Sequence, residues 1–298
     1  MTVTRVGVVA DLEHYRRHLT PIVDGLAVAG VEVFDGPGDI TLVAGRADAR
    51  RVNGPVILVE HGAGQRYMTE HGQLIDAYGE PTPEHNVVLY LSPRSETVGT
   101  MAEVLPNARI VVAGAPVLGT LGAVGAGDRV VFATHWASGL ASRIPEAGTS
   151  WPWSVRHVQA LTARYGTRVT VHAHPRHVAR VRNDVARRRI HVDVDPDWRS
   201  VLTQAQILVV DNSSIIWEAQ AVGVPVVLID HPLWRSDPGH DLRWGPEGRR
   251  LPLVRPGDNL TEIVDRELES PTVPVNVYGS DDPVEALGLA VAAIVDLL

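Results

Sequence analysis

The stretch ILVVDNSSIIWEAQAVGVPVVLID, residues 207–230, decides the fold. It starts with the apolar run Ile207–Val210, continues through a polar turn into a helical pattern over Ser213–Val222, and ends with a second apolar run, Val224–Ile229. Continuously apolar strands are typical of a parallel sheet that helices cover on both faces. Because strand, helix and strand follow one another in this order, the stretch predicts a βαβ unit and a parallel α/β fold.

The same alternation of short apolar runs and longer helical patterns extends over almost the whole chain. The predicted strands are Val6–Val9, Val31–Phe34, Ile40–Val43, Val56–Val59, Val87–Leu91, Arg109–Val112, Val130–Ala133, Arg168–His172, Ile190–Val194, Ile207–Val210 and Val224–Ile229. The predicted helices include Glu13–Ala29, Ser95–Leu105, Ser154–Tyr165, Ser213–Val222, Leu260–Leu268 and Pro283–Leu298, and Asp281 and Asp282 are candidate caps of the last one.

A weakly polar segment, residues 113–128 (AGAPVLGTLGAVGAGD), separates the first six predicted strands from the other five. It is rich in Gly and Ala, contains a Pro and carries no charge before its last residue. This composition is typical of an interdomain hinge. We therefore expect two doubly wound domains that face each other across a cleft.

The overall composition is that of a globular protein. Of 298 residues, 45% are hydrophobic and 21% are charged, which allows a sizeable core. There is no cysteine, which excludes disulfides and thiolate metal sites and leaves the redox compartment open. There is no apolar run of membrane-spanning length and no signal-peptide pattern, so we expect a cytoplasmic protein. The net charge of −8 argues against binding to duplex nucleic acid and against stable membrane insertion. All 27 basic residues are arginine, so any cation that meets a phosphate here is Arg or His.

Polar residues that follow strands are the first candidates for a site, because ligands of parallel α/β sheets bind at the carboxyl ends of strands. The first candidate, Glu60-His61-Gly62-Ala63-Gly64-Gln65, follows Val56–Val59. Gly62 and Gly64 would let the backbone approach a ligand closely, and His61 could serve as a general base. A tight turn with an incidental histidine explains the same residues.

The second candidate is His172-Ala173-His174-Pro175-Arg176-His177. We expect His172 to be a hydrogen-bonded core histidine, His174 to lie beyond the strand, and Pro175 to occupy the first turn of the next helix, whose N-terminus favours an anion. A metal site is the alternative, but no carboxylate lies near in sequence, so we expect none.

The third candidate is the polar turn of the opening stretch, Asp211-Asn212-Ser213-Ser214, with Glu218 one turn later. Ser213 or Ser214 would cap the helix and present N–H groups to a phosphate, while Glu218 could accept hydrogen bonds from ribose hydroxyls. An ordinary helix cap with Glu218 as a surface acid fits equally well.

Taken together, in this order and spacing, the three candidates resemble the CDP-glycerol glycerophosphotransferase family of teichoic-acid enzymes. They are more distantly similar to GT-B glycosyltransferases and to UDP-N-acetylglucosamine 2-epimerase. The resemblance covers about residues 55–230 and rests on Glu60-His61-Gly62-Ala63-Gly64, Gly114-Ala115-Pro116, the interrupted Thr-Trp pair Thr134-His135-Trp136, His174-Pro175, Asp211-Asn212-Ser213-Ser214, Gly223-Val224-Pro225-Val226 and Asp230. The chain departs from the family where Glu60 replaces the usual aromatic residue, and where a basic amphipathic membrane-binding segment is missing.

The resemblance implies a GT-B-like fold of two Rossmann-like domains. Residues 1–118 would form the acceptor-side domain, residues 119–282 the domain that binds the nucleotide donor, and residues 283–298 a helix that packs back on the first domain. It implies that His61 is the general base and that His174, Ser213 and Ser214 hold the donor diphosphate, with Glu218 near the ribose. Gly62, Gly64, Arg176 and Asp211 complete the expected donor-binding set, and His174 is also expected to be catalytic.

The predicted function is the transfer of glycerol phosphate, or of a glycosyl group, from a nucleotide-diphosphate-activated donor to an acceptor hydroxyl. The donor, CDP-glycerol or an NDP-sugar, is a substrate; no cofactor is required, and assistance by Mg²⁺ is compatible with the chemistry. An NDP-sugar epimerase or hydrolase, and a nucleotide-binding module without catalysis, are the alternatives. The oligomeric state is left open.

Overall fold

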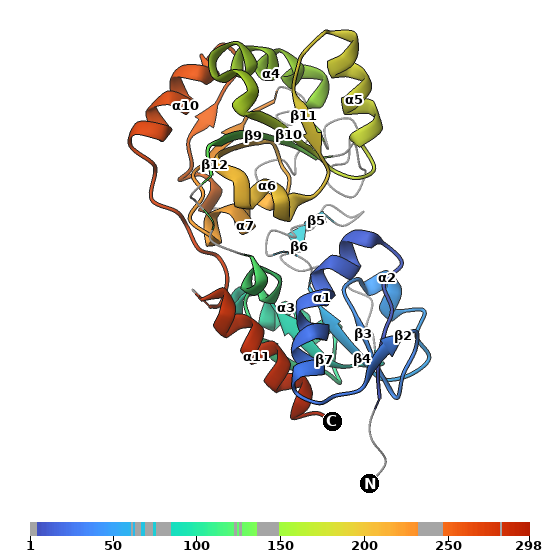
Figure 1. Ribbon diagram of the computed structural model, residues 1–298. Coiled ribbons are helices and arrows are strands. Elements are labelled where there is room, and N and C mark those ends of the chain that lie inside the picture. Colours follow the sequence, from blue (N-terminus) through green and yellow to red (C-terminus); the bar gives the residue numbers. More distant parts are fainter. Residues whose placement is uncertain are drawn as a thin grey trace. The chain divides into compact units, whose positions relative to one another are not determined.

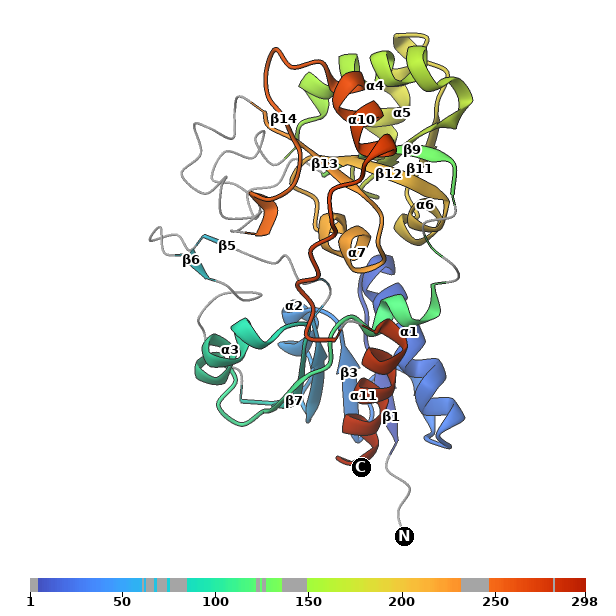
Figure 2. The same ribbon diagram turned by 90° about the vertical axis from the view of Figure 1, so that its left-hand side faces the viewer.

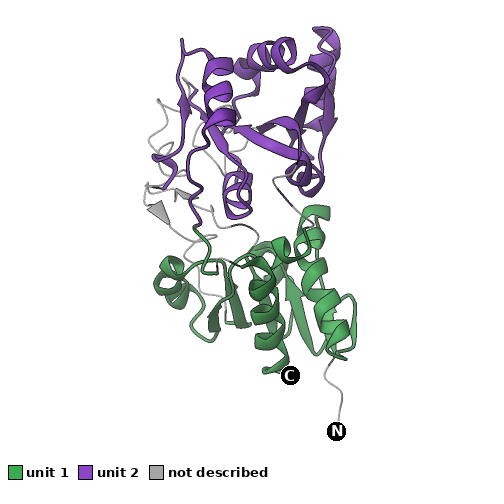
Figure 3. Ribbon diagram, turned by 60° about the vertical axis from the view of Figure 1, so that its left-hand side comes forward, with its two compact units in different colours: residues 1–69, 75–121, 277–298 green, residues 70–74, 122–276 purple. Residues whose placement is uncertain are grey.

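The computed structural model describes residues 5–60, 62, 67–68, 74–75, 85–121, 124, 127–135, 149–231, 247–280 and 282–298. The chain divides into two compact units (Figure 3). Unit 1 comprises residues 1–69, 75–121 and 277–298, and unit 2 comprises residues 70–74 and 122–276. Each unit has a six-stranded sheet of its own, and all the strand pairs in both sheets are parallel.

The sheet of unit 1 has the strand order β2-β1-β3-β4-β7-β8. Its strands are β1 (Val6–Val8), β2 (Val33–Asp35), β3 (Ile40–Val43), β4 (Val56–Val59), β7 (Val87–Ser92) and β8 (Arg109–Val112). Every residue of β3 and β4 is buried, as the continuously apolar runs predicted. Two short strands, β5 (Tyr67–Met68) and β6 (Leu74–Ile75), pair separately.

The helices of unit 1 include two that lie far apart in sequence and pack together. They are α1 (Glu13–Val28) and α11 (Pro283–Val295), and Figure 2 shows them side by side. The packing is close, because a Cβ added to Gly25 of α1 would lie 2.6 Å from Cγ2 of Val291 of α11. The remaining helical elements are α2 (Arg46–Ala49), η1 (Ser95–Thr97), α3 (Val98–Val104) and η2 (Pro116–Thr120).

The sheet of unit 2 has the order β11-β10-β9-β12-β13-β14. Its strands are β9 (Arg129–Thr134), β10 (Val169–Ala173), β11 (Asp193–Asp195), β12 (Ala205–Val210), β13 (Val226–Ile229) and β14 (Leu253–Val254). The helices are α4 (Trp151–Tyr165), η4 (Gly166–Arg168), α5 (Val178–Arg187), α6 (Trp198–Gln204), α7 (Ile215–Ala221) and α10 (Leu260–Glu269), labelled in part in Figure 1.

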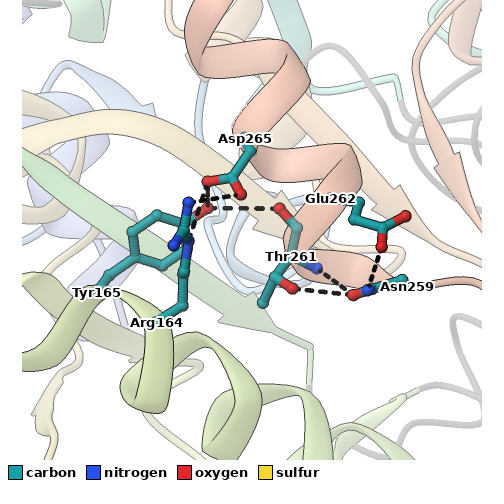
Figure 4. Close-up of polar contacts among 6 residues, drawn as sticks. All are labelled: Arg164, Tyr165, Asn259, Thr261, Glu262 and Asp265. Atoms are coloured by element: carbon teal, nitrogen blue, oxygen red, sulfur yellow. Dashed lines mark hydrogen bonds and ion pairs between the residues drawn. The ribbon is translucent and has the colours of Figure 1, made fainter.

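Polar contacts join the C-terminal end of α4 to Asp265 in the middle of α10 (Figure 4). The Tyr165 hydroxyl donates to Oδ1 of Asp265 over 2.7 Å, and Arg164 pairs with the same carboxylate at 3.1 Å. The side chain of Asn259 caps α10 by accepting the N–H of Thr261. The hydrogen bond from Tyr165 lowers the pKa of Asp265, with a further contribution from Arg164.

The α/β fold class predicted from the sequence is confirmed, since two parallel six-stranded sheets are interleaved with helices. The prediction missed β14 and α6, whose short sequences give little periodicity. Two helix starts were wrong: α4 begins at Trp151 instead of Ser154, and α7 at Ile215 instead of Ser213. Within the described residues, no helix is both long enough and apolar enough to cross a membrane.

Candidate functional site

The strand order of unit 2 defines a topological switch point between β9 and β12. From β9 the chain winds outward through β10 and β11 on one side, and then through β12, β13 and β14 on the other. Connections therefore leave β9 and β12 in opposite directions, and ligands of doubly wound sheets bind at this type of switch point. The described residues that leave these two strands are Thr134, His135 and Asp211.

Asp211 is the centre of this edge. Its side chain is completely buried, and its carboxylate accepts hydrogen bonds from both ends of the connection between β9 and α4. The N–H of His135 donates over 2.9 Å, the N–H and hydroxyl of Ser150 donate over 2.9 and 3.0 Å, and the hydroxyl of Thr134 donates over 3.1 Å. Burial raises the pKa of Asp211, and the hydrogen bonds from Ser150, His135 and Thr134 oppose that rise. The carboxylate thus fixes the ends of β9 and β12 and the start of α4 relative to one another.

Direct binding of the donor by Asp211 stays a prediction. Both carboxylate oxygens accept protein donors within this completely buried site, a geometry that suits a positioning role. The same geometry corrects the expected helix cap. Ser214 makes no capping hydrogen bond with its side chain; instead Oδ1 of Asp211 accepts the N–H of Ser213 at 3.3 Å, an Asx-type turn that delays the helix to Ile215.

The residues next to Asp211 present polar groups to the same edge. Ser213 and Ser214 are half-buried, and neither is needed as a side-chain cap. Asn212 leaves only 7% of its surface exposed, yet its amide oxygen has no hydrogen-bond partner in the described part of the chain. A buried amide without a partner costs free energy, which a ligand that donates a hydrogen bond would recover.

The histidines after β9 and β10 lie together. The rings of His135 and His174 are 5.7 Å apart between centroids, although the residues are separated by most of a βαβ unit. The N–H of Arg176 donates to Nδ1 of His174 over 3.2 Å, so in the neutral ring Nε2 carries the proton and can donate to an anion. His174 is half-buried and Arg176 is exposed, which leaves both at the surface of this edge.

Two other histidines of the second candidate are buried. His172 is a core residue, as predicted, and its Nδ1 lies 3.0 Å from the carbonyl of Asp195. Burial lowers the pKa of His177, and Arg180 lowers it further. The expectation that Pro175 occupies the first turn of a helix was wrong, because α5 starts only at Val178 with His177 before it.

Glu218 was expected either near a ribose or as a surface acid. The surface alternative was wrong, because the side chain is only 4% exposed within α7. Its place on the helix that directly follows the Asp211 turn keeps it close to the candidate site in sequence and fold. A role toward a ribose stays a prediction.

In unit 1 the first candidate follows β4. His61 and Gly64 lie outside the described residues, so their roles stay predictions. Gly62 is buried and has a φ of 109°, a backbone conformation that favours glycine. Glu60 is 7% exposed and accepts a hydrogen bond from the hydroxyl of Tyr90 on the neighbouring strand β7. Burial raises the pKa of Glu60 to about 8, against the opposing charge of Arg94.

Sequence reasoning missed the charged residues buried at this edge of unit 1. Arg46 and Asp48 of α2 are 3% and 1% exposed, and Arg94 after β7 is 4% exposed. The carboxylate of Asp48 accepts the N–H of Asp11, which lies after β1, over 3.4 Å. The signal available was Arg46 placed two residues after β3, the strand beside β1 at the switch point of this sheet.

No group of three or more His, Asp or Glu side chains within the described ranges is arranged to hold a metal ion. The potential ligands of the two edges are used otherwise: Asp211 accepts N–H and O–H donors, and Glu60 accepts the Tyr90 hydroxyl. The hydroxyls and imidazoles at this edge of unit 2 suit an anion with several acceptor oxygens, whereas the unpartnered amide oxygen of Asn212 suits a donor group of the same ligand.

The sequence matches no protein-family model and no curated protein. Its structure is similar to a putative UDP-N-acetylglucosamine 2-epimerase from Listeria monocytogenes, with a TM-score of 0.60, 14% identity, and coverage of 100% of this chain and 98% of that one. It is also similar to MnaA of S. aureus in a structure with UDP (TM-score 0.56, 13% identity, 99% and 98% covered). A third similar structure is the UDP-GlcNAc 2-epimerase from Methanocaldococcus jannaschii (TM-score 0.55, 12% identity, 99% and 100% covered).

The chain has a GT-B-like fold. These similarities extend over nearly the whole length of each protein, and at 11–14% identity they concern the fold alone. In this chain the fold consists of two parallel six-stranded sheets interleaved with helices.

Proposed function

We propose that the protein is a transferase that moves glycerol phosphate or a glycosyl group from a nucleotide-diphosphate-activated donor to an acceptor hydroxyl. The observation that carries the proposal is the buried Asp211 carboxylate, which fixes the loops at the switch point of unit 2. Around it, the hydroxyls of Ser213 and Ser214 and the ring of His174 offer hydrogen bonds to a diphosphate, and the amide oxygen of Asn212 can accept one from a hydroxyl of the donor. Unit 2 is the donor-binding domain in this proposal, and unit 1 is the acceptor side.

The chemistry follows from the groups available. The acceptor oxygen attacks the β-phosphorus of CDP-glycerol, or the anomeric carbon of an NDP-sugar, and the bond to the departing nucleotide breaks. His61 takes the proton of the acceptor hydroxyl, as the resemblance to glycerophosphotransferases implies. The imidazoles and hydroxyls at the edge of unit 2 stabilise the negative charge on the nucleotide as it leaves, together with the guanidinium of Arg176.

An NDP-sugar epimerase is the second candidate. The epimerase names of the similar structures favour it, and one of those structures contains UDP. An epimerase would use the same diphosphate site, but it needs acid and base groups that act on the sugar. In unit 1 the buried Glu60 is the described carboxyl nearest in sequence to His61, and its raised pKa keeps it protonated at neutral pH.

The acceptor is proposed to be a hydroxyl compound in solution or on a macromolecule. A net charge of −8 disfavours a position on an anionic membrane, and arginine is the sole source of side-chain cations other than histidine.

One experiment separates the readings. The protein is incubated with radiolabelled CDP-glycerol and with several UDP- and GDP-sugars, with and without acceptor alcohols, and nucleotide release is measured. A transferase releases nucleotide and yields a labelled product that requires the acceptor. An epimerase changes the sugar without net nucleotide release and without an acceptor. Binding without either reaction would contradict catalysis and leave a nucleotide-binding module.

A further inference from the structure

The segment Trp151-Pro152-Trp153 at the start of α4 contains one buried and one exposed indole. Successive residues of an α-helix turn by about 100°, so positions two apart face nearly opposite directions. Trp151 is completely buried, its ring 6.5 Å from that of Phe132, and its Nε1 donates to Asp184 over 3.0 Å. Trp153 leaves 42% of its surface exposed and is the one exposed large aromatic residue among those the structure describes. Core packing therefore explains Trp151 but not Trp153.

Trp153 is fixed to the loops of the candidate site. Its backbone N–H donates to the carbonyl of Ser150 over 2.9 Å. The N–H and hydroxyl of Ser150 in turn donate to the Asp211 carboxylate. A short chain of hydrogen bonds thus links Trp153 through Ser150 to Asp211, the buried carboxylate at the switch point.

The ring of His231 lies next to the indole of Trp153. His231 follows β13, is 1% exposed, and its ring centroid lies 5.9 Å from that of Trp153 at an interplanar angle of 40°. Its Nε2 lies 2.8 Å from the carbonyl of Thr149, and since a carbonyl only accepts, Nε2 is the donor and the ring is locked in place. Burial lowers the pKa of His231, although the hydrogen bond to Thr149 opposes this. The result is an aromatic pair in which His231 is held by a hydrogen bond and Trp153 remains partly exposed.

We propose that Trp153, backed by His231, is a stacking platform for a flat-faced ring of the nucleotide-activated donor. The inference rests on the proposed donor site, because the platform borders the same Asp211-organised loops. His174 and Arg176 follow β10, whereas His231 follows β13, so these two groups and the platform lie on opposite sides of the switch point between β9 and β12. A diphosphate at the switch point carries the nucleobase on one end and, in an NDP-sugar, a sugar ring on the other. Both rings have a face that stacks on an indole.

Titration calorimetry with CDP, UDP, UDP-N-acetylglucosamine and inorganic pyrophosphate tests this. Four proteins are compared: the wild type, Trp153→Ala, Trp153→Phe, and Leu289→Ala as a matched control. Leu289 lies on α11 of unit 1 and is 41% exposed, nearly the same fraction as Trp153. Trp153→Ala is expected to weaken binding of the ring-bearing ligand about tenfold or more. Pyrophosphate, which has no ring, is expected to bind all four proteins equally, and Trp153→Phe to retain most of the affinity.

The pattern of losses identifies the ring. A loss shared by CDP, UDP and UDP-N-acetylglucosamine assigns the platform to the nucleobase, and a loss confined to UDP-N-acetylglucosamine assigns it to the sugar; both support the platform. Unchanged affinities in Trp153→Ala, or an equal loss for pyrophosphate, would overturn it while leaving the donor site intact. If the wild type binds none of the four ligands, the proposed function fails together with the platform. Equal thermal stability of Trp153→Phe and the wild type checks that the fold is preserved.

Discussion

Replacement of Asp211 by alanine is predicted to destabilise unit 2 by about 3–5 kcal/mol. The change removes the acceptor of three backbone N–H groups, on His135, Ser150 and Ser213, and of two hydroxyls. Hydrogen bonds to a charged group contribute roughly 1.5–3 kcal/mol each, so five of them would exceed the total stability of many domains. Two effects reduce the sum. The desolvation of a fully buried carboxylate opposes them by several kcal/mol, and Thr134 keeps a second partner in Thr149 at 2.9 Å.

Tryptophan fluorescence during urea unfolding measures this effect selectively. All seven tryptophans lie between residues 136 and 244, and therefore within unit 2. With a urea dependence of about 2 kcal/mol per molar, the midpoint of Asp211→Ala is expected to fall by roughly 1.5–2.5 M. Asp211→Asn, which keeps one acceptor oxygen, should lose about half as much. The control is Asp128→Ala, whose exposed ion pair with Arg129 should contribute less than about 1 kcal/mol. A loss below about 1 kcal/mol for Asp211→Ala would refute the view that this carboxylate fixes the switch point.

Three further predictions concern other parts of the chain. Burial raises the pKa of Glu60 to about 8 from an ordinary value of 4.5, so the folded protein retains a proton that the unfolded chain loses above pH 4.5. The contribution of Glu60 to the free energy of unfolding should therefore fall between pH 5 and 8, by at most about 1.4 kcal/mol per pH unit. In circular-dichroism unfolding curves, Glu60→Gln should remove this slope. Asp282 accepts the N–H of Val284 over 2.8 Å at the start of α11. In the same assay Asp282→Ala should lower the free energy of unfolding by about 1 kcal/mol, and Asp282→Asn should lower it much less. Equal losses for the two variants would exclude a capping role. In sedimentation with anionic liposomes the protein should stay in the supernatant. The exposed run Arg187-Arg188-Arg189 contributes about 1 kcal/mol of membrane-binding free energy per charge, and no apolar face inserts beside it. Strong, salt-sensitive pelleting would contradict this and support a lipid-linked acceptor.

The parallel sheets were predictable because the sequence signal and the structural cause are the same. Strands such as β12 are buried on both faces, and only continuous apolar runs satisfy that environment. Leu253–Val254 of β14 is too short to show any periodicity, and it was missed for that reason. The shifted start of α7 has a local cause: Asp211 accepts the N–H of Ser213 two residues later, and the capping propensity of the serines alone does not reveal this turn.

The candidate site was predictable as a set of positions, but not as a set of roles. Polar residues at strand ends identified His174 and Asp211, whereas the burial of Asp211 depends on Ser150, which lies 61 residues earlier in the chain. Glu60 could be recognised as unusual, but its partner Tyr90 is on another strand 30 residues away. The adjacent indoles of Trp151 and Trp153 are alike in sequence, and only the helix start at Trp151 separates the core residue from the exposed one.

The central claim is that the switch-point loops of unit 2 bind the diphosphate of a nucleotide donor. Titration calorimetry of CDP and UDP with the wild type, Ser214→Ala and His61→Ala tests it most directly. The account predicts one binding site per chain, an affinity that Ser214→Ala weakens by about 1–3 kcal/mol, and an affinity that His61→Ala leaves nearly unchanged because His61 acts on the acceptor. Absence of binding to the wild type, or a loss of nucleotide in His61→Ala as large as in Ser214→Ala, would contradict it.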